Sequence, residues 1–247
     1  MLIIVKLTSS LSQNRYTGNM KKIIFGIFAH PDDEAFGPCG TLLKESRDGS
    51  DVHLIMLTAG DAGTNLSGTP DLGAVRLEEW RQAGQLLGTK SMHYFGYEDG
   101  TLSNSVMVEI ADRVMTTVLS LIENAPEDTE IEFMSFDFSG LSGHIDHIVA
   151  TRSACLAFYR LQETDARFKR VRLFCLPASL YPEHSVEWLY KEPGHPEHEI
   201  DEIIDARELR DDIVQVMRTH KTQQEDCEAV LATQGDQLGL DHFTIKI

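Results

Sequence analysis

The chain has 247 residues, of which 42% are hydrophobic and 25% are charged. This is the composition of an ordinary globular protein, and the length is sufficient for one large domain with a real core. A net charge of -17 at pH 7 argues against a partner that is bound mainly through its phosphates, because such binding depends on Lys and Arg. We therefore expect no nucleic-acid partner.

The cysteines and the first residues bear on location and domain organisation. The four cysteines lie far apart without a C-x-x-C spacing, so neither a zinc ribbon nor a disulfide framework is indicated, and a cytoplasmic location is the simplest. The opening MLIIVKL is too short for a membrane span. We expect a flexible extension over residues 1–19, with Met20 as an alternative start, and a single domain over residues 20–247.

Apolar, β-branched runs alternate with helical patterns along most of the chain. In chain order we expect a strand at Ile23–Phe28, a helix at Thr41–Arg47, a strand at Val52–Leu57, a helix at Ala74–Leu87 closed by Gly88, a strand at Met92–Phe95, a helix at Val106–Glu123, a strand at Ile131–Met134, a helix at His144–Leu161 and a strand at Arg172–Leu176. Such alternation is typical of βαβ units. The expected fold is a Rossmann-like three-layer α/β sandwich with a mostly parallel central sheet.

The character of the sequence changes beyond Pro177. A stretch rich in Pro, His and Glu predicts a long loop there. We expect a short edge strand at Glu199–Asp201 and a final helical region over Ala206–Ala232. The loop at 63–70 is a candidate substrate lid.

Polar segments follow the first four expected strands. They are His30–Glu34, Thr58–Asp61, Gly96–Asp99 and Ser135–His147. In open parallel sheets, ligands bind at the carboxyl ends of the strands, where these connections gather. Four polar loops should therefore meet at one edge of the sheet.

The segment after the first strand reads AHPDDEAFG and places one imidazole beside three acids. Clustered like charges cost free energy unless a cation or solvent compensates them. An imidazole nitrogen and a carboxylate oxygen from one turn suit Zn²⁺ or a similar metal, and SGHIDH at 142–147 offers another imidazole. Three protein ligands and an open position are typical of a catalytic zinc that activates water, with a remaining acid as general base.

AHPDDEAFGPCGTL at 29–42 and GHIDH at 143–147 together resemble the LmbE-like (PIG-L) family of zinc-dependent N-acetylglucosaminyl deacetylases. Supporting segments are LTAGD at 57–61, RLEEWRQAGQLLG at 76–88, FGYEDGTL at 95–102 and HKTQ at 220–223. The chain departs from the family at Ile145, where Pro is common, at Pro38 and Cys39, and in HKTQ instead of HKSQ or HRSQ. None of these departures changes a proposed ligand.

The resemblance implies metal ligation by His30, Asp33 and His147. Asp32 would be the general base, and the metal would be Zn²⁺, with Fe²⁺ or another divalent transition metal as the alternative. The implied reaction is hydrolysis of an acetamide on an N-acetylglucosamine-containing small molecule or glycoside. The resemblance is also compatible with a homo-oligomer.

Three further residues take roles from the resemblance. His144, charged and oriented by Asp146, would stabilise the oxyanion or help to deliver a proton. Arg76 would lie near the sugar hydroxyls. Whether Asp32 or His144 protonates the leaving amine stays open.

Two other functions fit the same residues. One is an amidase of similar mechanism that cleaves a different acyl group, and the other is a non-catalytic, metal-bound sugar-binding protein. A nucleotide-binding dehydrogenase is disfavoured because no G-x-G-x-x-G follows the first strand.

Several polar residues have simpler interpretations. Glu34 is expected to cap the helix that follows it, while Asp61 and Asp99 are interpreted as turn residues. His184, His195 and His198 lie between prolines and glutamates and indicate a solvated segment more than a second metal site. Trp80 is expected in the core.

Overall fold

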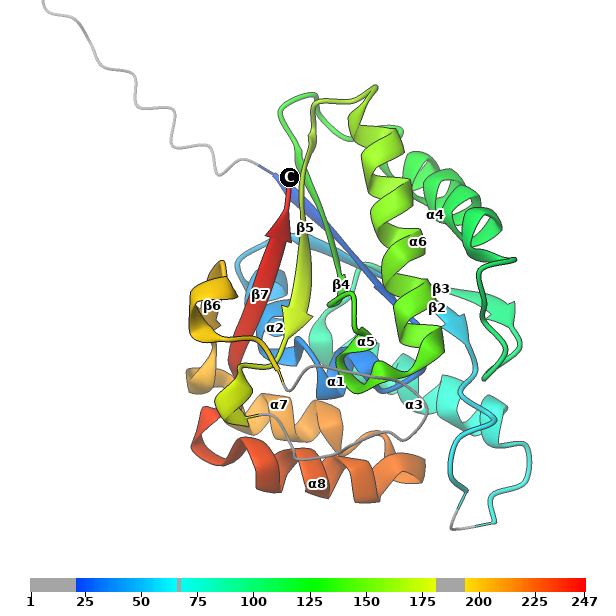
Figure 1. Cartoon of the computed structure of the whole chain (residues 1–247), viewed down its shortest axis with the longest axis vertical. Helices are drawn as coiled ribbons and strands as arrows, with labels where there is room; N and C mark the ends of the chain where they lie inside the picture. Colours follow the sequence, from blue (N-terminus) through cyan, green and yellow to red (C-terminus); the bar gives the residue numbers. More distant parts are fainter. Residues whose placement is uncertain (1–20, 66–67, 181–193) are drawn as a thin grey trace, which may run out of the picture.

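The computed structural model describes residues 21–65, 68–180 and 194–247, so the expected extension over residues 1–19 lies outside the described residues. A seven-stranded sheet runs through the middle of the molecule in the order β3-β2-β1-β4-β5-β7-β6 (Figure 1). The first five strands are parallel, and β7 is antiparallel to both β5 and β6. The strands are β1 (Lys22–Phe28), β2 (Asp51–Thr58), β3 (Ser91–Tyr97), β4 (Glu130–Phe136), β5 (Phe168–Cys175), β6 (Glu202–Asp205) and β7 (Leu240–Lys246).

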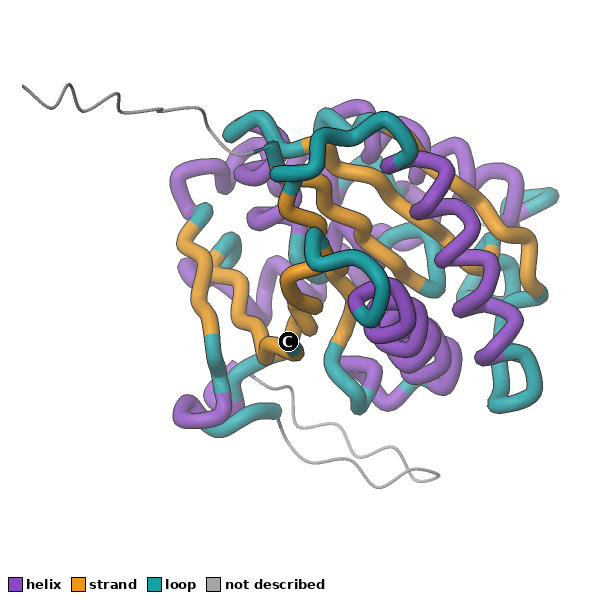
Figure 2. The backbone as a smooth tube through the Cα atoms, turned by 90° about the horizontal axis from the view of Figure 1, so that it is seen from above, coloured by secondary structure: helices purple, strands orange, loops and turns teal. Residues whose placement is uncertain are grey.

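Helices cover both faces of the sheet, which makes the three-layer sandwich that the sequence predicts (Figure 2). Successive residues of β1 point to opposite faces: Phe25 packs with Phe158 of α6 in one core, and Ile24 packs with Leu42 and Trp80 in the other. Both faces are therefore buried, as expected of parallel strands. The helices are α1 (Asp33–Phe36), α2 (Cys39–Arg47), α3 (Leu72–Leu87), α4 (Met107–Ile122), α5 (Gly140–Gly143), α6 (Ile145–Gln162), α7 (Arg210–Met217) and α8 (Gln224–Gln234).

The first five strands and the helices α2, α3, α4 and α6 confirm the prediction within a few residues, whereas the short α1 and α5 were not predicted. Gly88 ends α3 with φ 72°, a left-handed conformation that glycine adopts without steric cost. Trp80 is 4% exposed and lies in the core, as expected.

The last third of the chain differs from the prediction. The helical region expected over Ala206–Ala232 is two helices, α7 and α8, because the Thr219 hydroxyl donates to the Val216 carbonyl at 2.6 Å and the chain turns at His220. The edge strand is β6 at Glu202–Asp205, whereas Glu197–Glu199 forms a 3₁₀ turn, so the expected strand at Glu199–Asp201 is wrong. Strand β7 has no counterpart in the prediction.

The strand order places a crevice between β1 and β4. From β1 the chain proceeds outward to β2 and β3, and then returns to β4 on the opposite side of β1. The loops after β1 and β4 consequently leave the sheet in opposite directions, which is where ligands bind in open α/β sheets. His30–Asp33 follows β1, and the 137–147 segment follows β4.

Two general features accompany this fold. All four cysteines are buried and unpaired. Among the described helices, none combines the length and apolar character that a bilayer span requires.

Candidate metal centre

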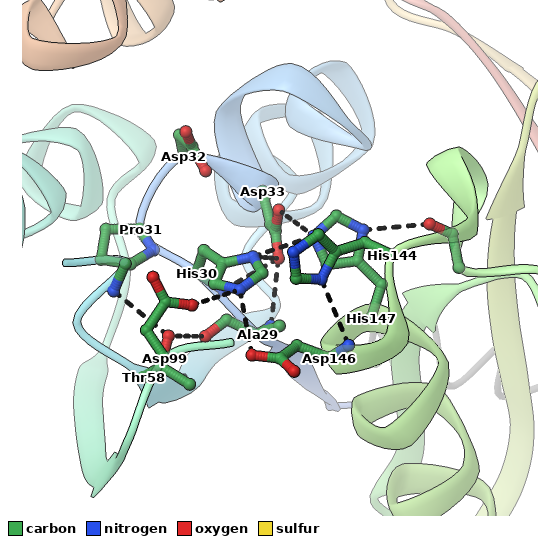
Figure 3. A network of polar contacts seen from close by, with 12 residues as sticks. Ala29, His30, Pro31, Asp32, Asp33, Thr58, Asp99, His144, Asp146 and His147 are labelled. Carbon is green, nitrogen blue, oxygen red and sulfur yellow. Dashed lines mark hydrogen bonds and ion pairs between the residues drawn. The ribbon is translucent and has the colours of Figure 1, made fainter. Parts of the chain in front are cut away.

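The crevice brings the three predicted metal ligands together (Figure 3). His30 Nδ1 lies 3.0 Å from His147 Nε2, and His147 Nε2 lies 3.1 Å from Asp33 Oδ1. Asp33 Oδ2 is 3.9 Å from His30 Nδ1. Ligand atoms at about 2.0–2.1 Å from a tetrahedral zinc would be about 3.3 Å apart. The three side chains therefore have the spacing of a tetrahedral metal site, although they come from positions 117 residues apart in the chain.

The hydrogen bonds of the outward-facing nitrogens assign the tautomers of both imidazoles. His147 Nδ1 donates to the Gly140 carbonyl at 3.0 Å, so Nε2 presents its lone pair to the cluster. His30 Nε2 lies 2.9 Å from Asp99 Oδ1 and 3.5 Å from Asp146 Oδ2, so this nitrogen carries the hydrogen and Nδ1 presents a lone pair. Two lone pairs facing each other at 3.0 Å repel unless a cation or a proton lies between them. The donor set therefore fits a divalent metal.

Asp33 is prepared as the third ligand by the backbone around it. Its Oδ2 accepts hydrogen bonds from the backbone N–H groups of Ala29 and His30, both at 3.0 Å, which leaves Oδ1 directed at the imidazoles. Burial alone would raise the pKa of this carboxyl, but contact with His147 and His30 lowers the pKa well below its ordinary value. Asp33 is therefore an anion at neutral pH.

A second group of acids surrounds His30 on the side away from His147. Asp99 was interpreted from the sequence as a turn residue, and the turn is present, since Gly100 has φ 76°. The structure adds that Asp99 is 8% exposed and contacts His30. Burial lowers the pKa of His30, but the hydrogen bonds to Asp146 and Asp99 outweigh it and raise the pKa to about 10. The surroundings thus stabilise positive charge at this position.

Other groupings near His30 also bring ligand atoms within 4.8 Å: His30, His144 and His147, and separately His30, Asp99 and Asp146. The acids of the second grouping accept hydrogen bonds from backbone N–H groups. Asp146 accepts from the N–H groups of Gly100 and Leu102 at 2.8 and 3.1 Å, and Asp99 accepts from Ala62 N–H at 2.7 Å. These two acids fix the loop after β3 and also orient His30. Carboxylates that accept a hydrogen bond from a metal-binding histidine commonly have this role.

Asp32 lies beside the ligand group in a strained conformation. Its φ of 119° is rare for a residue with a side chain, and such strain is concentrated at functional sites. Burial raises the pKa of its carboxyl to about 7, although Arg76 acts in the opposite direction.

Arg76, which was expected near sugar hydroxyls, is 4% exposed and directed at Asp32. Its Nη2 donates to Asp32 Oδ2 at 2.9 Å and to the Pro31 carbonyl at 2.7 Å. Its Nη1 donates to the Gly60 carbonyl at 2.7 Å. The guanidinium therefore joins the loops after β1 and β2 and holds the Asp32 carboxylate.

His144 begins α6, and its contact with Asp146 differs from the expectation. The backbone N–H of Asp146 donates to His144 Nδ1 at 3.2 Å, so the side chain caps the helix, while the Asp146 carboxylate faces Gly100, Leu102 and His30. Burial, followed by His147 and His30, lowers the pKa of His144. An acceptor at Nδ1 and a lowered pKa favour a neutral imidazole with its hydrogen on Nε2, not the charged ring that was expected.

A buried ion pair behind α1 connects the site to the HKTQ segment. Glu34 was expected to cap the helix after it, but it lies inside α1, and its Oε2 accepts from the backbone N–H of the preceding Asp32 at 3.3 Å. Its Oε1 also lies 2.9 Å from His220 Nε2, and both side chains are fully buried. Two positions further, Thr222 donates to Glu79 of α3 through its backbone N–H and its hydroxyl. The segment fixes the rear of the site, which its place in the sequence did not reveal.

The remaining histidines do not form a second metal site among the described residues. His195 Nε2 lies 3.0 Å from the buried Asp137 carboxylate, so it is not in a solvated segment as expected. His198 is exposed, and His184 lies outside the described residues.

A cavity of about 720 Å³ opens onto the candidate metal centre. It is lined by residues of the centre described above, by Ala62, and by Gly63 and Thr64 of the expected lid loop. The volume is in the range of pockets that enclose small organic ligands.

Comparison with known proteins agrees with this geometry. The family model described as PIG-L, GlcNAc-PI de-N-acetylase, matches residues 25–159. A probable N-acetyl-alpha-D-glucosaminyl L-malate deacetylase 2 of Bacillus anthracis is 28% identical over 126 residues, covering 49% of this chain and 52% of that protein. The diacetylchitobiose deacetylase of Thermococcus kodakarensis is 31% identical over 137 residues, covering 54% of this chain and 48% of that protein.

These alignments span about half the length of both relatives. The fold is similar over a longer range: the structure of N,N'-diacetylchitobiose deacetylase from Pyrococcus horikoshii superposes with a TM-score of 0.65 at 20% identity, covering 92% of this chain and 84% of that one. The family match includes both motifs of the candidate metal centre and more than half of the chain. The protein belongs to the PIG-L family, the LmbE-like family that its motifs resemble.

Proposed function

We propose that the protein is a zinc-dependent N-deacetylase that removes the acetyl group from an N-acetylglucosamine-containing small molecule or glycoside. The observation that carries the proposal is the convergence of two imidazole lone pairs and one carboxylate, in which His147 Nε2 lies 3.0 Å from His30 Nδ1 and 3.1 Å from Asp33 Oδ1. The names of the two relatives, which denote deacetylases of acetamido sugars, support the same chemistry. The four buried, unpaired cysteines suit a reducing cytoplasm.

His30, Asp33 and His147 would hold the metal, and Fe²⁺ would accept the same ligands. When bound, Zn²⁺ supplies Lewis acidity that lowers the pKa of water and polarises a carbonyl. Asp99 and Asp146 keep the hydrogen of His30 on Nε2, so that Nδ1 stays available as a ligand.

Asp32 is the general base in this proposal. Its carboxylate lines the cavity next to the ligand group and is kept in place by Arg76, so it can take a proton from the attacking water. As the acetamide C–N bond breaks, the same proton can pass to the leaving nitrogen, which gives acetate and a free amine. Arg76 positions Asp32 and does not contact the sugar in this role.

His144 is the oxyanion donor. Because its Nδ1 accepts from the α6 backbone, the hydrogen on Nε2 is free to donate to the carbonyl oxygen as negative charge develops there. The ring lines the cavity, which gives it access to a bound acetamide.

The test is acetate release from a panel of acetamido sugars with and without a chelator. We expect turnover that is lost with the chelator and restored by Zn²⁺. Matched N-propionyl and N-butyryl sugars separate a deacetylase from an amidase for another acyl group. If the zinc-loaded protein bound the sugars but released no acyl group from any of them, the result would instead support a non-catalytic sugar-binding protein.

A further inference from the structure

We propose that the substrate carries an uncharged, apolar aglycone, which binds next to the acetamido sugar against an apolar wall in the same cavity. This inference rests on the proposed function, because it places the acetamide at the candidate metal centre. It concerns the half of the cavity that the deacetylation chemistry does not use.

The apolar wall lines the same cavity as the polar residues of the candidate metal centre. It is formed by six side chains from five different parts of the fold: Phe36, Phe136, Leu141, Leu176, Leu180 and Val230. The ring of Phe136 lies 4.9 Å from that of His147, so the wall begins directly at a proposed metal ligand. A group attached to the sugar would therefore reach the wall without leaving the cavity.

Leu141 contributes to this wall from a strained backbone. Its φ of 59° and ψ of -60° are unfavourable for a residue with a side chain, and its N–H is held by the Asp137 carboxylate at 3.0 Å. Glycine would adopt this conformation readily, as it does at the preceding position 140, where φ is 66°. The Leu141 side chain packs partly against the core, and the part that faces the cavity can contact an apolar ligand group.

The charges around the cavity disfavour an anionic aglycone. Among the described lining residues, Arg76 is the only Arg or Lys, and its Nη atoms are engaged by Asp32, Pro31 and Gly60. The helix α8 adds the carboxylate of Asp226. Among these described residues a malate or phosphate group would find no free cationic partner, so an uncharged group is favoured.

Helix α8 supplies a matched pair of positions for a test. Asp226, Ala229, Val230 and Thr233 line the cavity with helical spacing, whereas Ala232 does not. Ala229 and Ala232 are both exposed alanines in the same helix. The substitution Ala229→Asp places a charge at the apolar wall, and Ala232→Asp places the same charge on α8 outside the cavity.

The experiment measures kcat/KM for acetate release from methyl, butyl and hexyl glycosides of N-acetylglucosamine by the zinc-loaded full chain. We expect kcat/KM to rise at least tenfold from methyl to hexyl, because each added methylene is removed from water. Ala229→Asp should flatten this rise, and Ala232→Asp should keep it. Leu141→Gly should reduce it while the melting temperature stays close to that of the wild type, because relief of strain offsets the lost contact. Equal kcat/KM along the series would overturn the inference.

A binding measurement separates failure of this inference from failure of the proposed function. Hexyl glucoside has no acetamide, so its calorimetric binding does not depend on deacetylation; methyl glucoside is the control. Tighter binding of hexyl glucoside that Ala229→Asp abolishes would support the apolar site even without acetate release. Acetate release from all glycosides, with equal binding of the two glucosides, would leave the deacetylase and reject the aglycone site.

Discussion

The two ends of the central sheet both bury charged side chains, but only one end balances them. At the amino ends of β1, β4 and β5, three cations and three acids contact one another: Lys22, Arg170 and Arg172 with Glu45, Glu132 and Glu202. Arg172 is 3% exposed and lies 2.6 Å from Glu45, 3.2 Å from Glu132 and 2.9 Å from Glu202. Every charge in this cluster has an opposite partner.

At the carboxyl ends of the parallel strands, four acids face one arginine. Asp32, Asp33, Asp99 and Asp146 are all at most 9% exposed, and Arg76 contacts only the first of them. Isolated buried charges are costly, and clustered acids repel. The difference shows how to distinguish the two clusters. Buried charges that balance one another stabilise the fold, whereas buried charges of one sign in excess indicate a ligand, here a cation.

The largest expected effect is on activity at the unbalanced end. Asp32→Asn should lower kcat by a factor of ~10²–10⁴, the usual loss of a general base, while zinc content and fold remain. The measurement is acetate release together with metal analysis of the purified variant. Asp61→Asn is the matched control, since Asp61 is an exposed aspartate in the loop after β2. Full activity of Asp32→Asn would remove Asp32 from the mechanism.

A substitution at the balanced end of the sheet should instead lower the stability of the fold. Arg172→Met leaves Glu45, Glu132 and Glu202 without their shared partner, and breaking a buried ion pair costs about 3–5 kcal/mol. Urea denaturation would measure the free energy of unfolding. Arg207→Met breaks an exposed pair with Asp205 and should leave the free energy of unfolding nearly unchanged. If both variants lost the same free energy, the amino-end cluster would not have the structural role assigned to it.

A milder change tests whether the excess acids serve a metal. Asp99→Asn retains an acceptor for His30 Nε2 but removes one negative charge, so we expect zinc affinity to fall by ~10–100-fold. Without metal, the variant should be less stable than the wild type: burial raises the pKa of Asp99, but contact with His30 outweighs it and lowers the pKa to about 2, so the folded chain stabilises this negative charge. Competition with a chelating dye measures the affinity, and thermal unfolding of the metal-free protein measures the stability. An unchanged zinc affinity would contradict the proposed part of Asp99.

The sequence predicted most of the sheet and the ligand group for one physical reason. Parallel strands buried on both faces are continuous apolar runs, so their ends are visible, and the residues directly after them must gather at one edge. The choice of His30, Asp33 and His147 at that edge came from the family resemblance of the two motifs. Asp99 was missed because Asp99-Gly100 is a strong turn signal, and a turn residue can also face a ligand.

Contacts between distant segments could not be predicted in this way. The pairing of Glu34 with His220 joins positions 186 residues apart and depends on the break between α7 and α8. Strand β7 was missed because Asp241, His242 and Thr244 interrupt its apolar pattern, yet all three are at most 9% exposed. Their burial depends on partners supplied by the fold, such as Thr41 in α2, whose N–H and hydroxyl donate to Asp241 at 2.6 and 2.7 Å.

Asp241 provides the smallest and last test, because it is a buried acid with neither a cation nor a metal among its described contacts. Burial raises the pKa of its carboxyl to about 6 despite the hydrogen bonds from Thr41. Since the folded-state pKa lies above the ordinary value, the folded chain retains a proton that the unfolded chain releases, and stability decreases as pH rises from about 4 to about 6. Asp241→Asn keeps the acceptor for Thr41 without this titration. We expect its free energy of unfolding to gain on the order of 2 kcal/mol over the wild type between pH 4 and pH 7. Urea denaturation at both pH values measures this free energy, and Asp236→Asn, at an exposed position, is the control. If the free energy of unfolding of Asp241→Asn and of the wild type changed in parallel with pH, the prediction would be wrong. Asp241 would then be as well stabilised in its charged form as the balanced acids at the other end of the sheet.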